Sequence, residues 1–270
     1  MMLALVNVYG IWHLRNHIPL ARFVATENLD SIVPSYDPRD LEVLAKAFHS
    51  PDYLTLLKQV MDLVGKCESG PSTHVLPALE HVQHGGGLIC SGMANLYFNV
   101  LRLNGFIARQ VYLIRHLFDR DDTHVTVEVL VDGKWIIADP TFHVGFEKNG
   151  QLIGAQTISE SLHDGSFNTI KPRFYGSVRY PPRLETYYTH WLPLFNNVLI
   201  PDRDQPYLSL WARIPPLRYW CGPVMYFQKV PNVSYQHLRF QDGLYFLFVV
   251  VLPLALLGMT CVSLLTLLAL

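Results

Sequence analysis

The segment from residue 123 to residue 139 constrains the fold more than any other, because its residues indicate a β-hairpin of fixed register. β-Branched residues dominate on both sides of Asp132-Gly133, as is typical of strands. An Asp-Gly pair between two such runs predicts a two-residue type I′ turn. Because that turn fixes the register of the flanking strands, we predict that Val131 pairs with Lys134.

The register also predicts where a histidine and an aspartate meet. Three further pairs follow from counting outward: Leu130 with Trp135, Glu128 with Ile137, and Thr126 with Asp139. His124 lies two residues before Thr126 and therefore shares its face of the strand. His124 and Asp139 are then diagonal neighbours, roughly 7–8 Å apart between backbones, which an imidazole and a carboxylate can bridge.

The other face of the first strand is expected to belong to the core, since it carries only valine: Val125, Val127, Val129 and Val131. The polar face then turns toward a different element. We expect that element to be the helix that begins at Cys90, so that a thiol, an imidazole and a carboxylate converge.

The helix at Cys90 is predicted by apolar residues that recur every three or four positions, at Ala94, Tyr97, Phe98 and Leu101. Asn104-Gly105 supplies a left-handed stop. The first turn of a helix carries unpaired N–H groups, and their partial positive charge lowers the pKa of a thiol. Cys90 is therefore a candidate nucleophile, although its position alone favours a buried structural cysteine.

Three glycines, Gly85 to Gly87, precede this helix start. Glycine lets a backbone approach a substrate closely, and free N–H groups in such a loop can bind an oxyanion. We therefore place Gly87 among the candidate substrate or oxyanion residues.

These blocks resemble a known family. GGGLICSGMANLYFNVLRLNGFIARQV and HVTVEVLVDGKWIIADPTF are similar to the core of the transglutaminase-like superfamily, papain-like thiol enzymes in which Cys, His and Asp occur in this order. The resemblance covers about residues 82–142. It implies that Cys90 is the nucleophile, His124 its base and Asp139 the residue that orients the base.

The resemblance also implies substrate or oxyanion roles for Gln83 and Trp135. Gln83 is similar to the glutamine of papain-like enzymes, although its place alone favours a polar residue at a helix end. Trp135 matches the tryptophan that usually precedes the aspartate. Many members carry an aromatic residue two positions after the histidine, where this chain has Thr126, so we expect a different wall of the substrate cleft.

The order of helices and then strands predicts an α+β fold, with the helix that bears Cys90 packed on an antiparallel sheet. We expect four parts along the chain. These are an N-terminal helical segment over 1–70, a transglutaminase-like catalytic core over 71–153, a Pro- and Tyr-rich accessory region over 154–241, and a transmembrane helix over 244–270.

The last part carries no charged residue, and about 20 apolar residues suffice to span a bilayer as a helix. We predict a single-pass C-terminal membrane anchor. Lys229 and Arg239 precede it, so the positive-inside tendency places the main domain in the cytoplasm. Residues 1–12 are apolar and are expected to form an interfacial or core element; an uncleaved signal segment there would invert the orientation.

Charge and motifs exclude several function classes. With 21 Lys and Arg against 22 Asp and Glu, no bulk positive field favours nucleic acid. No P-loop or GxGxxG motif is present, so we expect no cofactor. A zinc site built from His81, His84, Cys90 and His116 lacks the paired spacing of structural zinc sites.

Two classes of function fit these residues. The first is a thiol enzyme, namely a peptidase, amidase or acyl transferase, that forms a thioester on Cys90 with a protein or peptide substrate. The second is a non-catalytic, membrane-tethered binding module on the same fold. A metal-dependent hydrolase is a third alternative.

Overall fold

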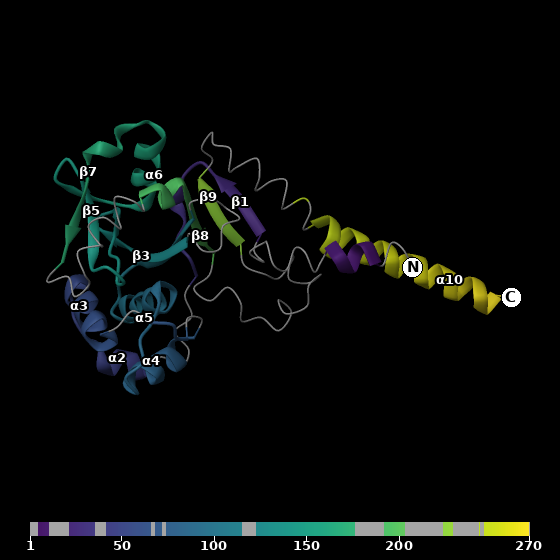
Figure 1. The fold of residues 1–270 in the computed structure, drawn as a ribbon, viewed down its shortest axis with the longest axis horizontal. Coiled ribbons are helices and arrows are strands. Elements are labelled where there is room, and N and C mark those ends of the chain that lie inside the picture. Colours follow the sequence, from purple (N-terminus) through teal and green to yellow (C-terminus); the bar gives the residue numbers. More distant parts are fainter. Residues whose placement is uncertain are drawn as a thin grey trace. The chain divides into compact units, whose positions relative to one another are not determined.

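The computed structural model describes residues 5–10, 22–35, 42–65, 68–71, 74–114, 123–175, 192–202, 224–228, 243 and 246–269 (Figure 1). Three residues weighed above, His116, Lys229 and Arg239, lie outside these ranges. The chain forms two compact units. One comprises residues 25–204 and 226–229, and the other comprises residues 1–24, 205–225 and 230–270.

The elements of the fold are helices early in the chain and strands thereafter. The helices are α2 (Glu42–Ala47), α3 (Tyr53–Val64), α4 (Val75–Gln83), α5 (Cys90–Leu103) and α6 (Ala155–His163), with short 3₁₀ helices η1 (Leu29–Ser31), η2 (Ser166–Thr169) and η3 (Leu192–Asn196). The strands are β1 (Arg22–Thr26), β2 (Ala108–Ile114), β3 (Thr123–Val131), β4 (Lys134–Ile137), β5 (Val144–Lys148), β6 (Gln151–Ile153), β7 (Ile170–Phe174), β8 (Asn197–Pro201) and β9 (Val224–Gln228).

These strands form two sheets, and the mixed α+β character is as expected. The larger sheet has six strands in the order β1-β9-β8-β2-β3-β4, and the smaller has three in the order β6-β5-β7. β2 pairs antiparallel with both β3 and β8. The hairpin β3–β4 therefore lies at one side of the larger sheet, with β4 as its last strand.

The predicted register of that hairpin is confirmed. Val131 pairs with Lys134, Leu130 with Trp135 and Glu128 with Ile137. Asp132 and Gly133 have φ of 49° and 77°, as a type I′ turn requires. The ladder ends earlier than predicted, because β4 stops at Ile137 and Asp139 forms a bridge with Val144 instead of pairing with Thr126.

The expected packing of α5 on the polar face of β3 is wrong. Helix α5 packs on the valine face, where Val125, Val127 and Val129 share one core cluster with the buried side of the helix. A bond between side chains agrees with this arrangement, since Gln110, which pairs with Val127, donates through Nε2 to Oδ1 of Asn95 in α5. The physical reason is that α5, which is buried over the ten consecutive residues from Gly92 to Leu101, removes more apolar surface from water against an apolar sheet face than against a polar one.

The polar face of β3 belongs to a second cluster. That cluster contains Val111 and Leu113 of β2, which pair with Thr126 and His124, and it includes residues of β5, α6 and η3. Helices α2 to α5 lie on one side of the larger sheet and α6 lies on the other (Figure 1). The larger sheet is thus covered on both faces.

A buried ion pair stabilises this second face. The guanidinium of Arg109 donates through Nε to Oε2 of Glu128 at 2.6 Å, and both side chains are fully buried. The same guanidinium donates to two carbonyl oxygens at η1, and it stacks 3.9 Å from the ring centroid of Trp135. Because every charge has partners, the burial of this pair is tolerated.

The compact unit continues beyond the predicted boundary at residue 153. Helix α6 and strands β7 and β8, all from the region 154–241, belong to the same unit as β2, β3 and β4. The predicted accessory region therefore supplies part of the layer that covers the polar face of β3.

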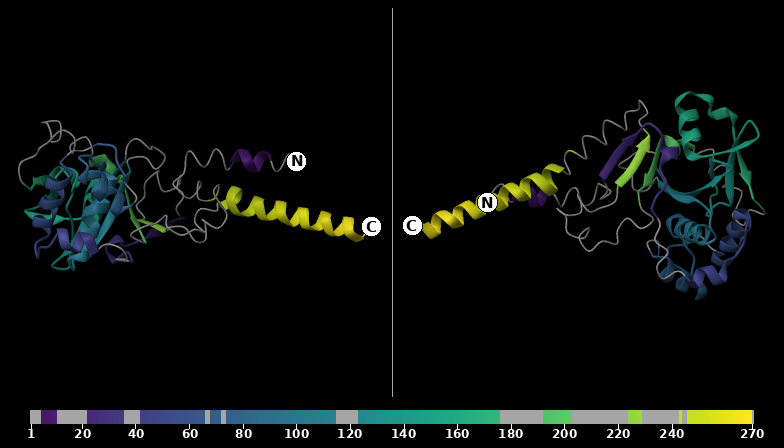
Figure 2. Two further views of the ribbon diagram at one scale, coloured as in Figure 1. Left: turned by 90° about the horizontal axis from the view of Figure 1, so that it is seen from below. Right: turned by 180° about the vertical axis from the view of Figure 1, so that it is seen from behind.

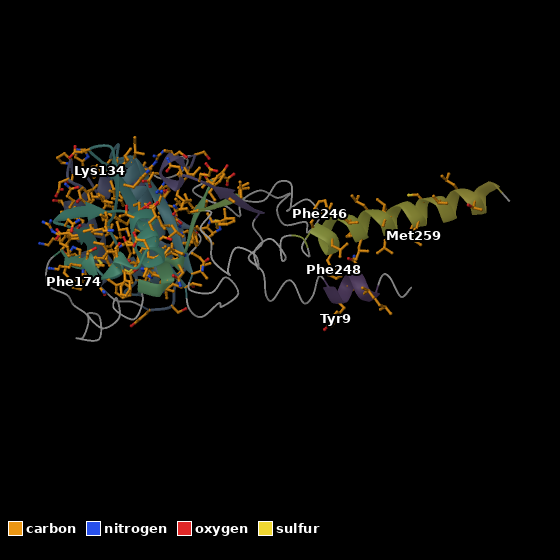
Figure 3. All side chains as sticks on the ribbon, turned by 90° about the horizontal axis from the view of Figure 1, so that it is seen from above. Tyr9, Lys134, Phe174, Phe246, Phe248 and Met259 are labelled. Carbon is orange, nitrogen blue, oxygen red and sulfur yellow. The ribbon has the colours of Figure 1, made fainter. Side chains whose placement is uncertain are left out.

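The other unit contains both ends of the chain. Residues 5–10 are helical, and a π-helical turn (Leu247–Val251) leads into α10 (Leu252–Ala269). A Cβ added to Gly10 would lie 2.2 Å from a ring carbon of Phe248, so the two helical segments are in contact (Figures 2 and 3). Within the described part of the chain, no helix is both long and apolar enough to cross a membrane.

Candidate active site

Helix α5 places Cys90 at its first position. The preceding residue, Ile89, caps the helix with its backbone only, because its side chain has no oxygen to accept a hydrogen bond. The N–H groups of the first turn have no acceptor within the helix, and they give this end a partial positive charge. Cys90 is half-buried, so its sulfur is screened from bulk water but is not sealed off.

The loop before Cys90 owes its shape to a tight helix end. Helix α4 finishes in a Schellman motif, in which Gly85 has φ of +83°. The N–H of Gly85 donates to the carbonyl of Val82 at 2.9 Å, and the N–H of Gly86 donates to the carbonyl of His81 at 3.0 Å. Gly85 is therefore needed for its backbone conformation and not for contact with a substrate.

His124 and Asp139 are joined directly. Nε2 of His124 lies 2.5 Å from Oδ2 of Asp139, and both side chains are buried. Oδ1 of the carboxylate accepts the N–H groups of Thr141 at 2.8 Å and Phe142 at 3.0 Å. Three donors thus fix the carboxylate, and the carboxylate in turn fixes the orientation of the imidazole.

Cys90 completes the group. Its side chain is hydrogen-bonded to His124, and its sulfur accepts the backbone N–H of Val125. Because Nε2 of His124 faces Asp139, Nδ1 is the ring nitrogen left for the thiol. The helix packs on one face of β3 while His124 points to the other, so the three side chains meet at the end of the sheet where β3 begins and β4 ends.

The electrostatics of this group favour an ion pair. Burial raises the pKa of the Cys90 thiol, but the hydrogen bond and charge of His124 and the N–H of Val125 outweigh it, so the pKa is lowered. Burial lowers the pKa of His124, but the charge and hydrogen bond of Asp139 and the interaction with Cys90 raise it to about 10. Both shifts therefore favour the thiolate–imidazolium form of the pair over the neutral form.

Phe142 is a residue of the site that sequence reasoning missed. Its ring centroid lies 5.2 Å from that of His124, with 34° between the planes. The loop from Asp139 to Val144 is closed by backbone bonds in both directions, and this closure holds Phe142 over the imidazole. The sequence signal for it is the phenylalanine that ends the Asp-Pro-Thr-Phe run, three residues after Asp139.

The three remaining candidates lie in different places. Gly87 is buried in the loop before Cys90, and Gln83 is exposed at the last position of α4. Trp135 is buried at 5% exposure, and its indole N–H donates to the carbonyl of Asp30 at 2.9 Å. It pairs with Leu130, six residues along β3 from His124, so about 20 Å separate it from the imidazole.

Thr126 does not form a wall of a cleft. It is fully buried, and it pairs with Val111 within the second core cluster. The smaller residue at this position therefore changes the packing under the site rather than an exposed surface.

The part of the chain that the structure describes contains no group of three or more His, Cys, Asp or Glu side chains arranged to hold a metal ion. His81 and His84 belong to this part, and His84 turns its Nδ1 to the carbonyl of Glu80 at 2.7 Å.

Comparison with known proteins agrees with the geometry. Residues 50–140 match the family described as the transglutaminase-like superfamily, a range that runs from the approach to α3 to the residue after Asp139. No curated protein matches the chain. A transglutaminase-like domain is therefore supported for this range, and it contains Cys90, His124 and Asp139.

Proposed function

We propose that this transglutaminase-like domain catalyses thiol-dependent acyl chemistry, with Cys90 as nucleophile, His124 as base and acid, and Asp139 as the orienting carboxylate. The observation that carries the proposal is the chain of contacts from the Cys90 thiol through His124 to a carboxylate held by two backbone N–H groups. Cysteine nucleophiles are activated by such an adjacent base, and the base is oriented by a third group.

In the first step the Cys90 thiolate attacks the carbonyl carbon of an amide and a C–S bond forms. The carbonyl oxygen takes up the negative charge, and in this proposal N–H groups at the start of α5 stabilise it. The C–N bond then breaks. His124 gives the departing amine the proton that it had taken from the thiol, which leaves a thioester on Cys90.

In the second step an acceptor resolves the thioester. Water attacks the thioester carbonyl, His124 takes its proton, and the C–S bond breaks to release a carboxylic acid. An amine acceptor would produce a new amide by the same path. Hydrolysis is the default, because water is always present and transfer requires a cleft that excludes it.

The substrate is proposed to be a protein or peptide, because the match to the transglutaminase-like superfamily and the resemblance to papain-like thiol enzymes favour an amide bond as the one attacked. The alternative is a binding module that keeps the fold without turnover. Trapping of an acyl-enzyme intermediate distinguishes a catalytic protein from a binding module. The protein is mixed with an activated ester of a short peptide and quenched in acid, and peptide mass spectrometry then searches for the acyl group on Cys90.

A catalytic protein forms an acyl adduct on Cys90 that disappears on further incubation, and the variants Cys90→Ser and His124→Ala lose the adduct. A wild-type chain that never acquires it, although it is folded by circular dichroism, is a binding module and overturns the proposal.

Membrane attachment through residues 244–270 remains a proposal as well. The whole segment is uncharged, and α10 exposes large apolar side chains such as Leu254, Leu257 and Leu265. Fractionation of cells that express the full chain tests it. Recovery of the protein in the carbonate-resistant membrane pellet is expected, and recovery in the supernatant contradicts attachment.

A further inference from the structure

His81 occupies an unusual place between two glycines. A Cβ added to Gly86 would lie 2.2 Å from Nε2 of His81, a distance that real Cβ atoms essentially never show. A Cβ added to Gly70 would lie 3.0 Å from Cδ2 of the same ring. The imidazole therefore lies against the Cα atoms of both residues, and a side chain at position 86 would require the ring to move.

The backbone of His81 holds the same loop. Its carbonyl accepts the N–H of Gly86 in the Schellman motif that ends α4. The motif usually includes a contact between the side chain at this helix position and the residue two places beyond the cap. Here a flat ring meets a bare Cα, so any other residue at position 86 would displace the ring of His81.

The segment that contains Gly70 also contacts the start of α5. A Cβ on Gly70 would come within 2.4 Å of the carbonyl oxygen of Gly87, and one on Gly92 would come within 2.9 Å of the carbonyl oxygen of Pro71. The segment 68–71 therefore crosses both the glycine loop and the first turn that carries Cys90. His81 lies between this segment and the loop.

We propose that His81 is a positioning residue for the chemistry of Cys90: its ring fixes the Gly85–Gly87 loop, and with it the start of α5, whose backbone N–H groups stabilise the oxyanion. The inference rests on the proposed function. A site of this kind needs its groups held to within about 0.5 Å, and that precision comes from packing around the reacting residues. Positioning the loop requires only the flat shape of the His81 ring, and the ring transfers no proton in this role.

Two reactions of Cys90 separate positioning from general stability. Iodoacetamide is attacked at a CH₂ carbon, the C–S bond forms and iodide leaves, so no oxyanion develops. A p-nitrophenyl ester is attacked at a carbonyl carbon, an oxyanion develops, and nitrophenolate leaves as the C–O bond breaks. Only the second reaction depends on the N–H groups at the start of α5 that stabilise the oxyanion.

The variants are His81→Ala, Gly86→Ala and His81→Phe, with His84→Ala as the matched control. His84 lies at the same helix end, but its ring bonds only to its own helix, at the carbonyl of Glu80. We expect His81→Ala and Gly86→Ala to lower the acylation rate roughly tenfold or more while the alkylation rate stays within about twofold, since losing one oxyanion donor outright costs about 10²–10³.

His81→Phe is expected to keep most of the acylation rate, because it keeps a flat ring, and His84→Ala is expected to change neither rate. The inference is overturned if the two rates of Gly86→Ala fall together, if neither falls, or if His81→Phe loses acylation as His81→Ala does. Failure of the proposed function is distinguishable, because Cys90 of the wild-type chain would then show no preferential alkylation at all.

Discussion

Nε2 of His124 lies 2.5 Å from Oδ2 of Asp139, and the second oxygen of that carboxylate is occupied by two backbone N–H groups. The carboxylate is therefore fixed on one side before it meets the imidazole on the other. This arrangement fixes the ring so that Nδ1 faces the thiol, and it makes Asp139 the residue on which the ionisation of the whole group depends.

Asp139→Asn is expected to lower the rate of Cys90 acylation by a factor of about 10³–10⁴, the size of effect seen when a comparable orienting carboxylate becomes an amide. The amide removes the charge that raises the pKa of His124, and it favours the wrong tautomer. Stopped-flow release of nitrophenolate measures the rate. Asp132→Asn, an aspartate in the turn of the same hairpin, is the control and should leave the rate unchanged.

The pH dependence of Cys90 alkylation should have its inflection below that of an unperturbed thiol, because the pKa of Cys90 is lowered. The sign follows from ionisation: the rate rises as the thiol loses its proton, and it stays high while His124, with its pKa raised to about 10, keeps its own. In His124→Ala the inflection should move upward. An unchanged inflection in this variant would show that His124 does not activate the thiol.

Trp135→Phe should lower the free energy of unfolding by about 1 kcal/mol through loss of the indole bond to Asp30, with no change in the rate of Cys90 alkylation. The reason is distance, since Trp135 lies against Arg109 and far along the strand from His124. Chemical denaturation and iodoacetamide kinetics measure the two quantities. A large fall in the alkylation rate at normal stability would place Trp135 in the site after all.

Glu128→Ala should destabilise the protein by about 3–5 kcal/mol, because it removes the buried carboxylate of Arg109 and leaves the guanidinium with only the half-exposed Asp30 at 3.3 Å. The matched control is Glu147→Ala. Glu147 pairs with Arg173 at 2.8 Å on the surface, where such a pair contributes about 0–1 kcal/mol. Equal losses in the two variants, measured by urea denaturation, would contradict the assignment of Arg109 and Glu128 as a buried structural pair.

The parts of the site that could be predicted are those fixed by local chemistry. Asp132-Gly133 determines the register of β3 and β4, and the register is what brings His124 and Asp139 to the same face. The extent of α5 also follows from local signals. Helical periodicity indicates the helix that begins at Cys90, and Gly105, which has φ of +86°, ends it. None of these features needs information from distant residues.

What could not be predicted depends on contacts between distant residues. The face on which α5 packs is decided by ten buried positions of the helix, and the face of β3 that carries the imidazole is covered by residues from α6, η3 and β5. Strand β1 pairs with β9 across almost two hundred residues and β8 pairs with β2 across more than eighty, so no local pattern indicates their order.

One strand pair was missed although its signal was present. Asn149-Gly150 has φ of 55° and 77°, the conformation of a type I′ turn, and it joins β5 to β6. The dipeptide is as strong a hairpin signal as Asp132-Gly133. It was overlooked because β6 is only three residues long and shows no alternation.

The measurement that tests the central claim most directly is the rate at which iodoacetamide modifies each cysteine at about pH 6, where an ordinary thiol is almost fully protonated. The wild-type chain should react at Cys90 well before Cys67 and Cys221, and His124→Ala should lose that preference. Slow modification of Cys90 that does not depend on His124 would contradict the account.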